Sequence, residues 1–114
     1  MEKEETSGYI KDILLEIKRI GRFTERVKTL QEFKKDEKTM YACIRSFEIM
    51  GEAAKRVSSE AKKKFPLEVW GEMAGMRDKL IHDYGGVDFS VVWKTIKEDL
   101  PVLKKQMEEI LDEV

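Results

Sequence analysis

Apolar residues recur every three or four positions along almost the whole chain, which is the spacing of an α-helix. No segment alternates apolar and polar residues for long enough to predict a strand. Hydrophobic residues make up 41% of the 114 residues and charged residues 39%, so the chain can build both a core and an ionised surface. We therefore predict an all-α fold, an antiparallel bundle of four to five helices in which residues 1–114 form one domain.

The apolar stripes predict where the first two long helices lie. One spans about residues 7–27, with the acidic residues before it frayed, and the next spans about residues 39–58. Between them, Thr29 and Glu32 have the spacing of a capping box, which predicts a short helical turn. The first stripe consists of Ile10, Ile13, Leu14, Ile17, Ile20 and Val27, and the second of Met40, Cys43, Ile44, Phe47, Met50, Gly51, Ala54 and Val57.

A second apolar patch, Ala42 and Ile49, lies on the far side of the helix at 39–58. Because the main stripe of this helix is already used for the core, another subunit would cover the patch most simply, although a nearby helix could also do so. The patch favours a homodimer.

Glycine and proline divide the C-terminal half of the sequence. A third helix is expected at residues 69–84, ended by Gly85 and Gly86, and Asp88 is placed to cap a fourth helix. Pro101 interrupts the fourth apolar run, whose stripe continues beyond it, so we expect the last helix to be kinked at Pro101.

Composition limits the classes of function. With Cys43 as the single cysteine and His82 as the single histidine, the chain has neither an internal disulfide nor enough ligands for a Cys/His zinc site. The net charge of -1 gives no overall positive field for a polyanion, so any nucleic-acid site must be local. The lone cysteine and histidine favour a cytoplasmic protein with no metal or cofactor. The polar start and the absence of a long apolar run favour a soluble protein with no membrane contact.

The expected helix at 69–84 contains one contradiction. At 100° per residue, Arg77 falls near the centre of an apolar arc. Burying an unpaired guanidinium would cost several kcal/mol, so Arg77 either pairs with an acid on a neighbouring helix, such as Glu48 or Glu52, or opens into a cleft. The sequence allows both arrangements. The arc consists of Trp70, Met73, Ala74, Met76, Leu80, Ile81 and Tyr84.

Further chemistry-bearing residues follow Arg77 closely. His82 lies about 140° around the helix from Arg77, so the two residues could flank a groove. Asp78 precedes His82 by four positions and could hold its imidazole in one orientation if the helix is intact. Tyr84 returns to the face of Arg77 at the expected helix end.

The segment at 76–84, MRDKLIHDY, resembles the Arg-x4-His-x-Tyr motif of HepT-like HEPN proteins. The stretch FEIMGEAAKR at 47–56 resembles the second helix of that family, and residues 87–101 resemble its final segment. The resemblance implies the toxin of a prokaryotic toxin-antitoxin pair, a dimeric and metal-independent endoribonuclease. It also implies a small nucleotidyltransferase as antitoxin, which adenylylates the motif tyrosine, here Tyr84. A polar residue commonly follows the motif arginine in the family, as Asp78 does here.

The chemistry of RNA cleavage fits these residues. Without a metal, cleavage needs a base for the ribose 2′-OH, a cation for the charge that grows on the phosphoryl oxygens, and a proton for the departing 5′-oxygen. His82 and Arg77 match these needs, and the expected product is a 2′,3′-cyclic phosphate. One histidine cannot be base and acid at once, so a dimer that places two motifs across one cleft would complete the site.

Two other functions remain open. The chain could be a non-catalytic helical module that holds nucleotide or substrate for a nucleotidyltransferase, or a purely structural dimerisation subunit. An Arg77 buried against a carboxylate would favour these, and Arg77 and His82 facing one cleft would favour the nuclease. We interpret Cys43 as an inert core residue, and the basic side chains as a solvated face that could also guide RNA, namely Arg45, Lys55, Arg56 and Lys62 to Lys64.

Overall fold

The computed structural model describes residues 2–65, 69–82 and 86–114, and at residues 2, 3, 77, 78, 81, 82, 86 and 87 it describes the backbone alone. The elements in these residues are α1 (Glu2–Phe23), α2 (Leu30–Lys34), α3 (Glu37–Arg56), α4 (Ser59–Lys64), α5 (Val69–Ala74), α6 (Met76–Leu80), β1 (Ile81–His82), β2 (Gly86–Val87), α7 (Phe89–Lys94), the π-helical turn η1 (Thr95–Asp99) and α8 (Leu100–Glu113).

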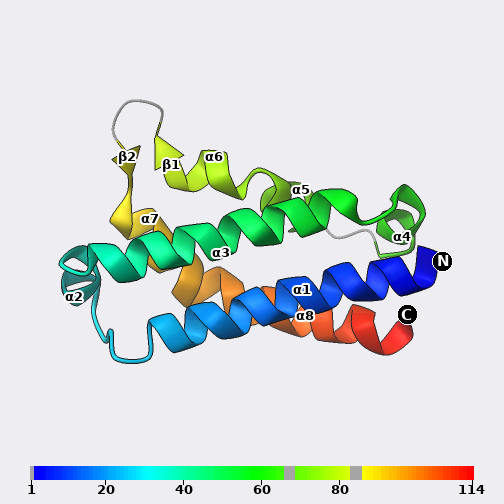
Figure 1. Ribbon diagram of the computed structural model, residues 1–114, viewed down its shortest axis with the longest axis horizontal. Coiled ribbons are helices and arrows are strands. Elements are labelled where there is room, and N and C mark those ends of the chain that lie inside the picture. The colour runs from blue at the N-terminus through cyan, green and yellow to red at the C-terminus, as the bar shows by residue number, and fades with distance from the viewer. Residues whose placement is uncertain (1, 66–68, 83–85) are drawn as a thin grey trace.

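The long segments run alternately in opposite directions (Figure 1). In that view α3 lies in the middle, with α1 packed along one side and α5 and α6 along the other. α8 packs against α1 and is joined to α7 through η1. This arrangement confirms the predicted all-α antiparallel bundle. None of the helices in the described ranges is both long and apolar enough to cross a membrane.

The first helix is longer at its start and shorter at its end than predicted. α1 begins at Glu2 rather than at residue 7, and acidic residues in the first turn of a helix interact favourably with its dipole. It ends at Phe23, where the Thr24 hydroxyl donates to the Ile20 carbonyl at 2.8 Å and a turn follows. Val27 is buried as predicted, but from the loop rather than from the helix.

Side-chain caps fix the two connections that surround α2. The Thr29 hydroxyl accepts from the Glu32 N–H at 3.1 Å, which confirms the cap predicted there. Asp36, which the sequence analysis did not single out, caps α3 by accepting from the Thr39 N–H at 3.1 Å and the Thr39 hydroxyl at 2.6 Å. Both hydrogen bonds lower the pKa of Asp36, and the one from the Thr39 hydroxyl has the larger effect.

The core follows the predicted stripes. Every residue of the predicted stripe on α3 is buried, and in α1 only Leu14 of the helical positions is partly exposed. Gly51 lies at a close approach of α3 and α5, because a Cβ added there would stand 2.8 Å from the Met73 carbonyl oxygen. The absence of a side chain at Gly51 is what allows the two helices to approach this closely.

The third helix differs from the prediction of one helix over 69–84. α5 ends at Ala74, Gly75 forms a turn, and α6 ends at Leu80. The Gly75 N–H still bonds to the Gly71 carbonyl at 3.0 Å, so the two helices follow one course. The backbone then becomes extended, and the antiparallel ribbon of β1 and β2 pairs Ile81 with Val87 and His82 with Gly86. The β-branched pair favours this extended backbone, which periodicity alone did not predict.

The interruption expected at Pro101 takes the form of the π-helical turn that precedes it. The Leu100 N–H bonds to the Thr95 carbonyl, five residues back, and Pro101 lies in the first turn of α8. Proline has no N–H and its ring crowds the carbonyl four residues earlier, so the preceding turn widens. Asp88 caps α7 as predicted, accepting from the Ser90 and Val91 N–H groups.

An aromatic cluster joins α2 to α7. The buried Phe33 ring meets Phe89 edge-on with centroids 6.0 Å apart, and Trp93 at 5.2 Å. Trp70 donates to the Phe65 carbonyl at 2.8 Å and is buried in α5. Phe33 and Trp70 therefore belong to the core, and Phe89 and Trp93 pack against it.

The contact at Gly51 generates a stability prediction. We expect Gly51→Ala to lower the free energy of unfolding by about 1–3 kcal/mol, because the new methyl group would collide with the backbone oxygen of Met73. Gly8→Ala is the matched control, since nothing lies within 4 Å of the Cβ that it adds to α1. That variant should gain about 0.5–1 kcal/mol. Urea denaturation measures both, and equal stabilisation by both would contradict the close approach.

Candidate functional site

The residues of the predicted site belong to one continuous stretch, α6 and β1. The backbone of Arg77 and Asp78 is in α6, and that of His82 is in β1, paired with Gly86. The side chains of these three residues, and all of Tyr84, lie outside the described residues. The roles predicted for them as catalytic and modified residues therefore stay predictions.

The end of α6 changes one part of the sequence argument. A helix through residue 84 would have placed Asp78 and His82 one helical turn apart, and Tyr84 on the face of Arg77. Because α6 ends at Leu80 and His82 is in a strand, helical spacing does not relate Asp78 to His82. Helical spacing also cannot bring Tyr84 back to the face of Arg77. Any contact among these residues depends on the ribbon that follows α6.

Buried side chains on both sides of Arg77 hold its backbone against the core. Trp70, Met73, Met76 and Leu80 are all buried, as the apolar arc predicted. They pack α5 and α6 against α3. The backbone of Arg77 therefore belongs to a helix that is packed against the core.

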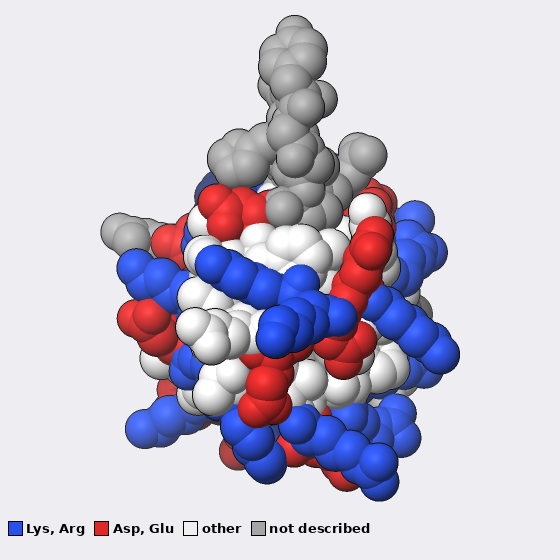
Figure 2. Space-filling model, turned by 90° about the vertical axis from the view of Figure 1, so that its left-hand side faces the viewer, with Lys and Arg blue, Asp and Glu red and all other residues white. Residues whose placement is uncertain are grey.

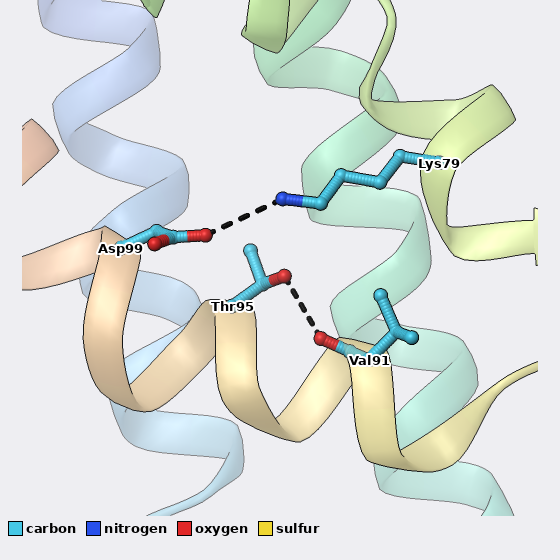
Figure 3. A network of polar contacts seen from close by, with 4 residues as sticks. All are labelled: Lys79, Val91, Thr95 and Asp99. Atoms are coloured by element: carbon cyan, nitrogen blue, oxygen red, sulfur yellow. Dashed lines mark hydrogen bonds and ion pairs between the residues drawn. The ribbon is translucent and has the colours of Figure 1, made fainter.

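A polar contact ties the outer side of α6 to the C-terminal segment (Figure 3). Lys79 Nζ lies 3.4 Å from Asp99 Oδ2 at the end of η1. Below this pair, the buried Thr95 hydroxyl donates to the Val91 carbonyl at 2.8 Å. Both partners of the ion pair are about half exposed, so the pair contributes little to the stability of the fold.

Hollows flank the α5–α6 segment on two sides. One, of about 340 Å³, is lined by α3 and α5, with Arg45, Glu52 and Lys55 at its wall and Met73 at its floor. The other, of about 370 Å³, lies between α5–α6 and the η1–α8 segment and contains Lys79 and Asp99. The segment that carries the motif is therefore bordered by polar depressions.

The acids predicted as alternatives for pairing with Arg77 lie on the α3 side. Glu48 and Glu52 both line the smaller hollow. Glu52 is 3.8 Å from Lys55 of its own helix. A pairing with Arg77 itself involves a side chain outside the described residues, so the alternatives of buried ion pair and open cleft stand as the sequence left them.

A cavity larger than both of these hollows lies elsewhere. It measures about 840 Å³ and lies between α1 and the η1–α8 segment, where Ile17, Ile20, Leu100 and several lysines line it. The described residues that line it belong to α1, the loop after α1, η1 and α8. We therefore assign the candidate site to the α6–β1 segment on its chemistry and not on cavity size.

The buried Cys43 does not add a nucleophile. Burial, and secondarily the Asp36 carboxylate, raise the pKa of its thiol to about 12, so it stays protonated at neutral pH. Among the residues that the structure describes, no three of the His, Cys, Asp and Glu side chains are grouped to hold a metal ion.

Charges of both signs are interspersed at the end of the molecule formed by α2 and the neighbouring turns. Figure 2, which faces this end, shows Lys and Arg alternating with Asp and Glu. No single basic field covers this face, in agreement with the near-zero net charge.

Comparisons with known proteins converge on one family. The profile described as Ribonuclease HepT-like matches residues 13–110. A "Probable ribonuclease HepT" of Thermococcus cleftensis is 45% identical over 108 residues, which cover 95% of this chain and 97% of that protein. Two further relatives are each named "Putative RNase". The one from Caldanaerobacter subterraneus subsp. tengcongensis is 47% identical over 76% of this chain and 80% of its own. The one from Methanocaldococcus jannaschii is 38% identical over 100% and 93%.

No solved structure matches this chain significantly. The profile match includes all of α5, α6 and the ribbon, and therefore the Arg-x4-His-x-Tyr motif. On the profile and on the identity and coverage of these relatives, the chain belongs to the Ribonuclease HepT-like family, the HepT-like branch of the HEPN proteins.

Proposed function

We propose that this protein is a metal-independent endoribonuclease, the toxin of a prokaryotic toxin-antitoxin pair. One observation carries the proposal: Arg77, His82 and Tyr84 stand at the motif spacing inside a family match that spans residues 13–110, and the relatives are named ribonucleases. The domain formed by residues 1–114 then acts on RNA in the cytoplasm.

His82 is the proton-transfer residue of the proposed reaction. An unperturbed imidazole titrates near pH 6.5, so both protonation states are populated near neutrality. Its neutral form takes the proton of the ribose 2′-OH, the 2′-oxygen attacks the adjacent phosphorus, and the bond to the 5′-oxygen breaks. The departing 5′-oxygen receives a proton from a protonated imidazole, so the products are a 2′,3′-cyclic phosphate and a 5′-hydroxyl.

Arg77 stabilises the negative charge that develops on the phosphoryl oxygens. The core-seated backbone of α6 supports this role because it limits the positions from which the guanidinium can reach a phosphate. Asp78 is the polar residue that follows the motif arginine. Its proposed role is to orient the imidazole across the turn from α6 to β1.

The first prediction concerns RNA cleavage in the presence of a chelator. Purified protein incubated with RNA and EDTA should generate 3′ ends that carry 2′,3′-cyclic phosphate, and His82→Ala should lower the rate by at least about 100-fold, the usual scale of general acid-base catalysis. The reaction is followed by gel electrophoresis and end-group analysis. Equal cleavage by the two proteins would indicate a contaminating nuclease and leave a binding or structural role.

We also propose that two copies form the active unit. Each chain has a single histidine, and the reaction needs a base and an acid at the same time. Two α6–β1 segments across one cleft would supply both. Ala42 and Ile49 on α3 are half-buried within one chain, so their remaining surface is available for a subunit contact.

A dilution experiment tests the homodimer. If the site is shared, cleavage per chain should fall as the protein is diluted through the concentration at which sedimentation velocity shows the dimer dissociating. A single-chain variant with two linked copies is the control and should keep its rate on dilution. A fully active monomer would remove the shared site from the mechanism.

The proposed antitoxin is a small nucleotidyltransferase that adenylylates Tyr84. The added group brings bulk and at least one negative charge next to the segment that carries Arg77. Its phosphate would occupy the site of the RNA phosphate and repel the substrate. Inhibition would then be local and would need no change of fold.

Co-expression in cells tests the role of Tyr84. Tyr84→Phe keeps the ring but removes the acceptor hydroxyl, so this toxin should stay active and arrest growth even with the nucleotidyltransferase present. The unmodified sequence with the same partner should grow normally, with a mass increase on the toxin peptide that contains Tyr84. Full neutralisation of Tyr84→Phe would mean that the partner acts by covering the site.

A further inference from the structure

Tyr41 is an aromatic residue that lies outside the hydrophobic core. Its side chain is 55% exposed on α3. Within the described part of the chain its ring meets neither another ring nor a cation. Arg45 follows one helical turn later, is also exposed, and has no ion-pair partner among the described residues. Residues four apart share a helix face, so α3 presents a phenol and a guanidinium side by side.

The position of this pair along α3 can be counted from the close contact at Gly51. Gly51 lies opposite Met73, and α5 and α6 run along α3 in the opposite direction (Figure 1). Leu80 is seven residues beyond Met73, a rise of about 10 Å, and the two residues of β1 add roughly 7 Å. Tyr41 is ten residues before Gly51, a rise of about 15 Å. Tyr41 and Arg45 therefore stand at the level of the end of α6 and of β1.

The surroundings leave the Arg45 charge available. It lines the hollow between α3 and α5, and of the acids in that hollow Glu52 is already 3.8 Å from Lys55. Because positive charge is not concentrated over the end of the molecule that Figure 2 shows, a general electrostatic field cannot supply the affinity for RNA there. Local contacts that combine stacking and charge would have to contribute.

We propose that Tyr41 and Arg45 form a subsite for unpaired RNA next to the reaction centre, an inference that rests on the proposed nuclease function. The Tyr41 ring stacks on a base that flanks the cleaved bond, and the Arg45 guanidinium binds the adjoining phosphate. Stacking on an aromatic side chain tolerates any base, whereas it requires a base that is free of a duplex. The subsite therefore selects single-stranded RNA without strong sequence preference.

The test measures binding separately from cleavage. A fluorescein-labelled single-stranded oligoribonucleotide of mixed sequence is titrated with full-length His82→Ala protein, and fluorescence anisotropy gives the dissociation constant. Adding Tyr41→Ala should weaken binding roughly 5- to 100-fold, the range found for loss of one stacked base. Tyr41→Phe should bind like the parent. Arg45→Ala should weaken binding and reduce the slope of log affinity against log salt by about 0.7.

Matched controls stand on α1, on the other side of α3. Phe23→Ala removes an aromatic ring that is 39% exposed, and Arg22→Ala removes an exposed guanidinium. Both should leave the RNA affinity unchanged. Duplex RNA of the same sequence should bind the parent more weakly and respond little to Tyr41→Ala.

Two outcomes overturn the subsite. Unchanged affinity in Tyr41→Ala and Arg45→Ala would exclude it, while RNA cleavage by the unsubstituted protein that is lost in His82→Ala would still support the proposed function. Loss of affinity accompanied by a change in sedimentation coefficient would show that Tyr41 and Arg45 belong to a contact between protein subunits.

Discussion

The approach of α5 to α3 at Gly51 sets the position of everything that carries chemistry in this chain. With no side chain at residue 51, the backbone of α5 comes within van der Waals distance of α3 at Met73. Because α5 continues into α6 and β1, this one contact sets the level at which Arg77 and His82 leave the helical core. A shallower contact would lift the whole segment away from α3 and from the charged side chains along it.

Much of the architecture follows from patterns that act locally. The stripes on α1 and α3 are buried because a helix with one apolar face has to turn that face inward, and each pattern repeats over about three turns or more. Thr29 and Asp88 cap helices because each places an oxygen next to unpaired N–H groups. These features need no information from distant parts of the chain.

The sequence predictions failed where contacts between distant parts of the chain determine the backbone conformation. The run after Gly75 has the periodicity of a helix, but it ends at Leu80 since Ile81 finds a strand partner in Val87. The residues around Ile81 do not by themselves predict this pairing with Val87. Lys79 and Asp99 are likewise separated by 20 residues, and only the packing of α6 beside η1 brings them together. The residues of the candidate site could be named from the motif, whereas their mutual geometry depends on this ribbon. Tyr41 illustrates another case: the apolar stripe leaves it outside the core face of α3, but its 55% exposure becomes known only when the neighbouring elements are placed.

The widened turn at Thr95–Asp99 allows one uninterrupted run of chain to serve two sets of neighbours. Before it, α7 rests on α2 and α3; after it, α8 rests on α1. The extra residue in the turn rotates the apolar face of the helix, so that this face points towards α2 and α3 before the turn and towards α1 after it. A homologue that lost a single residue here would be forced to restore an ordinary helix. Its last fourteen residues would then revolve by about a quarter turn and carry Leu103 and Met107 towards water. Length in this stretch should therefore be under tighter selection than the identity of its surface residues.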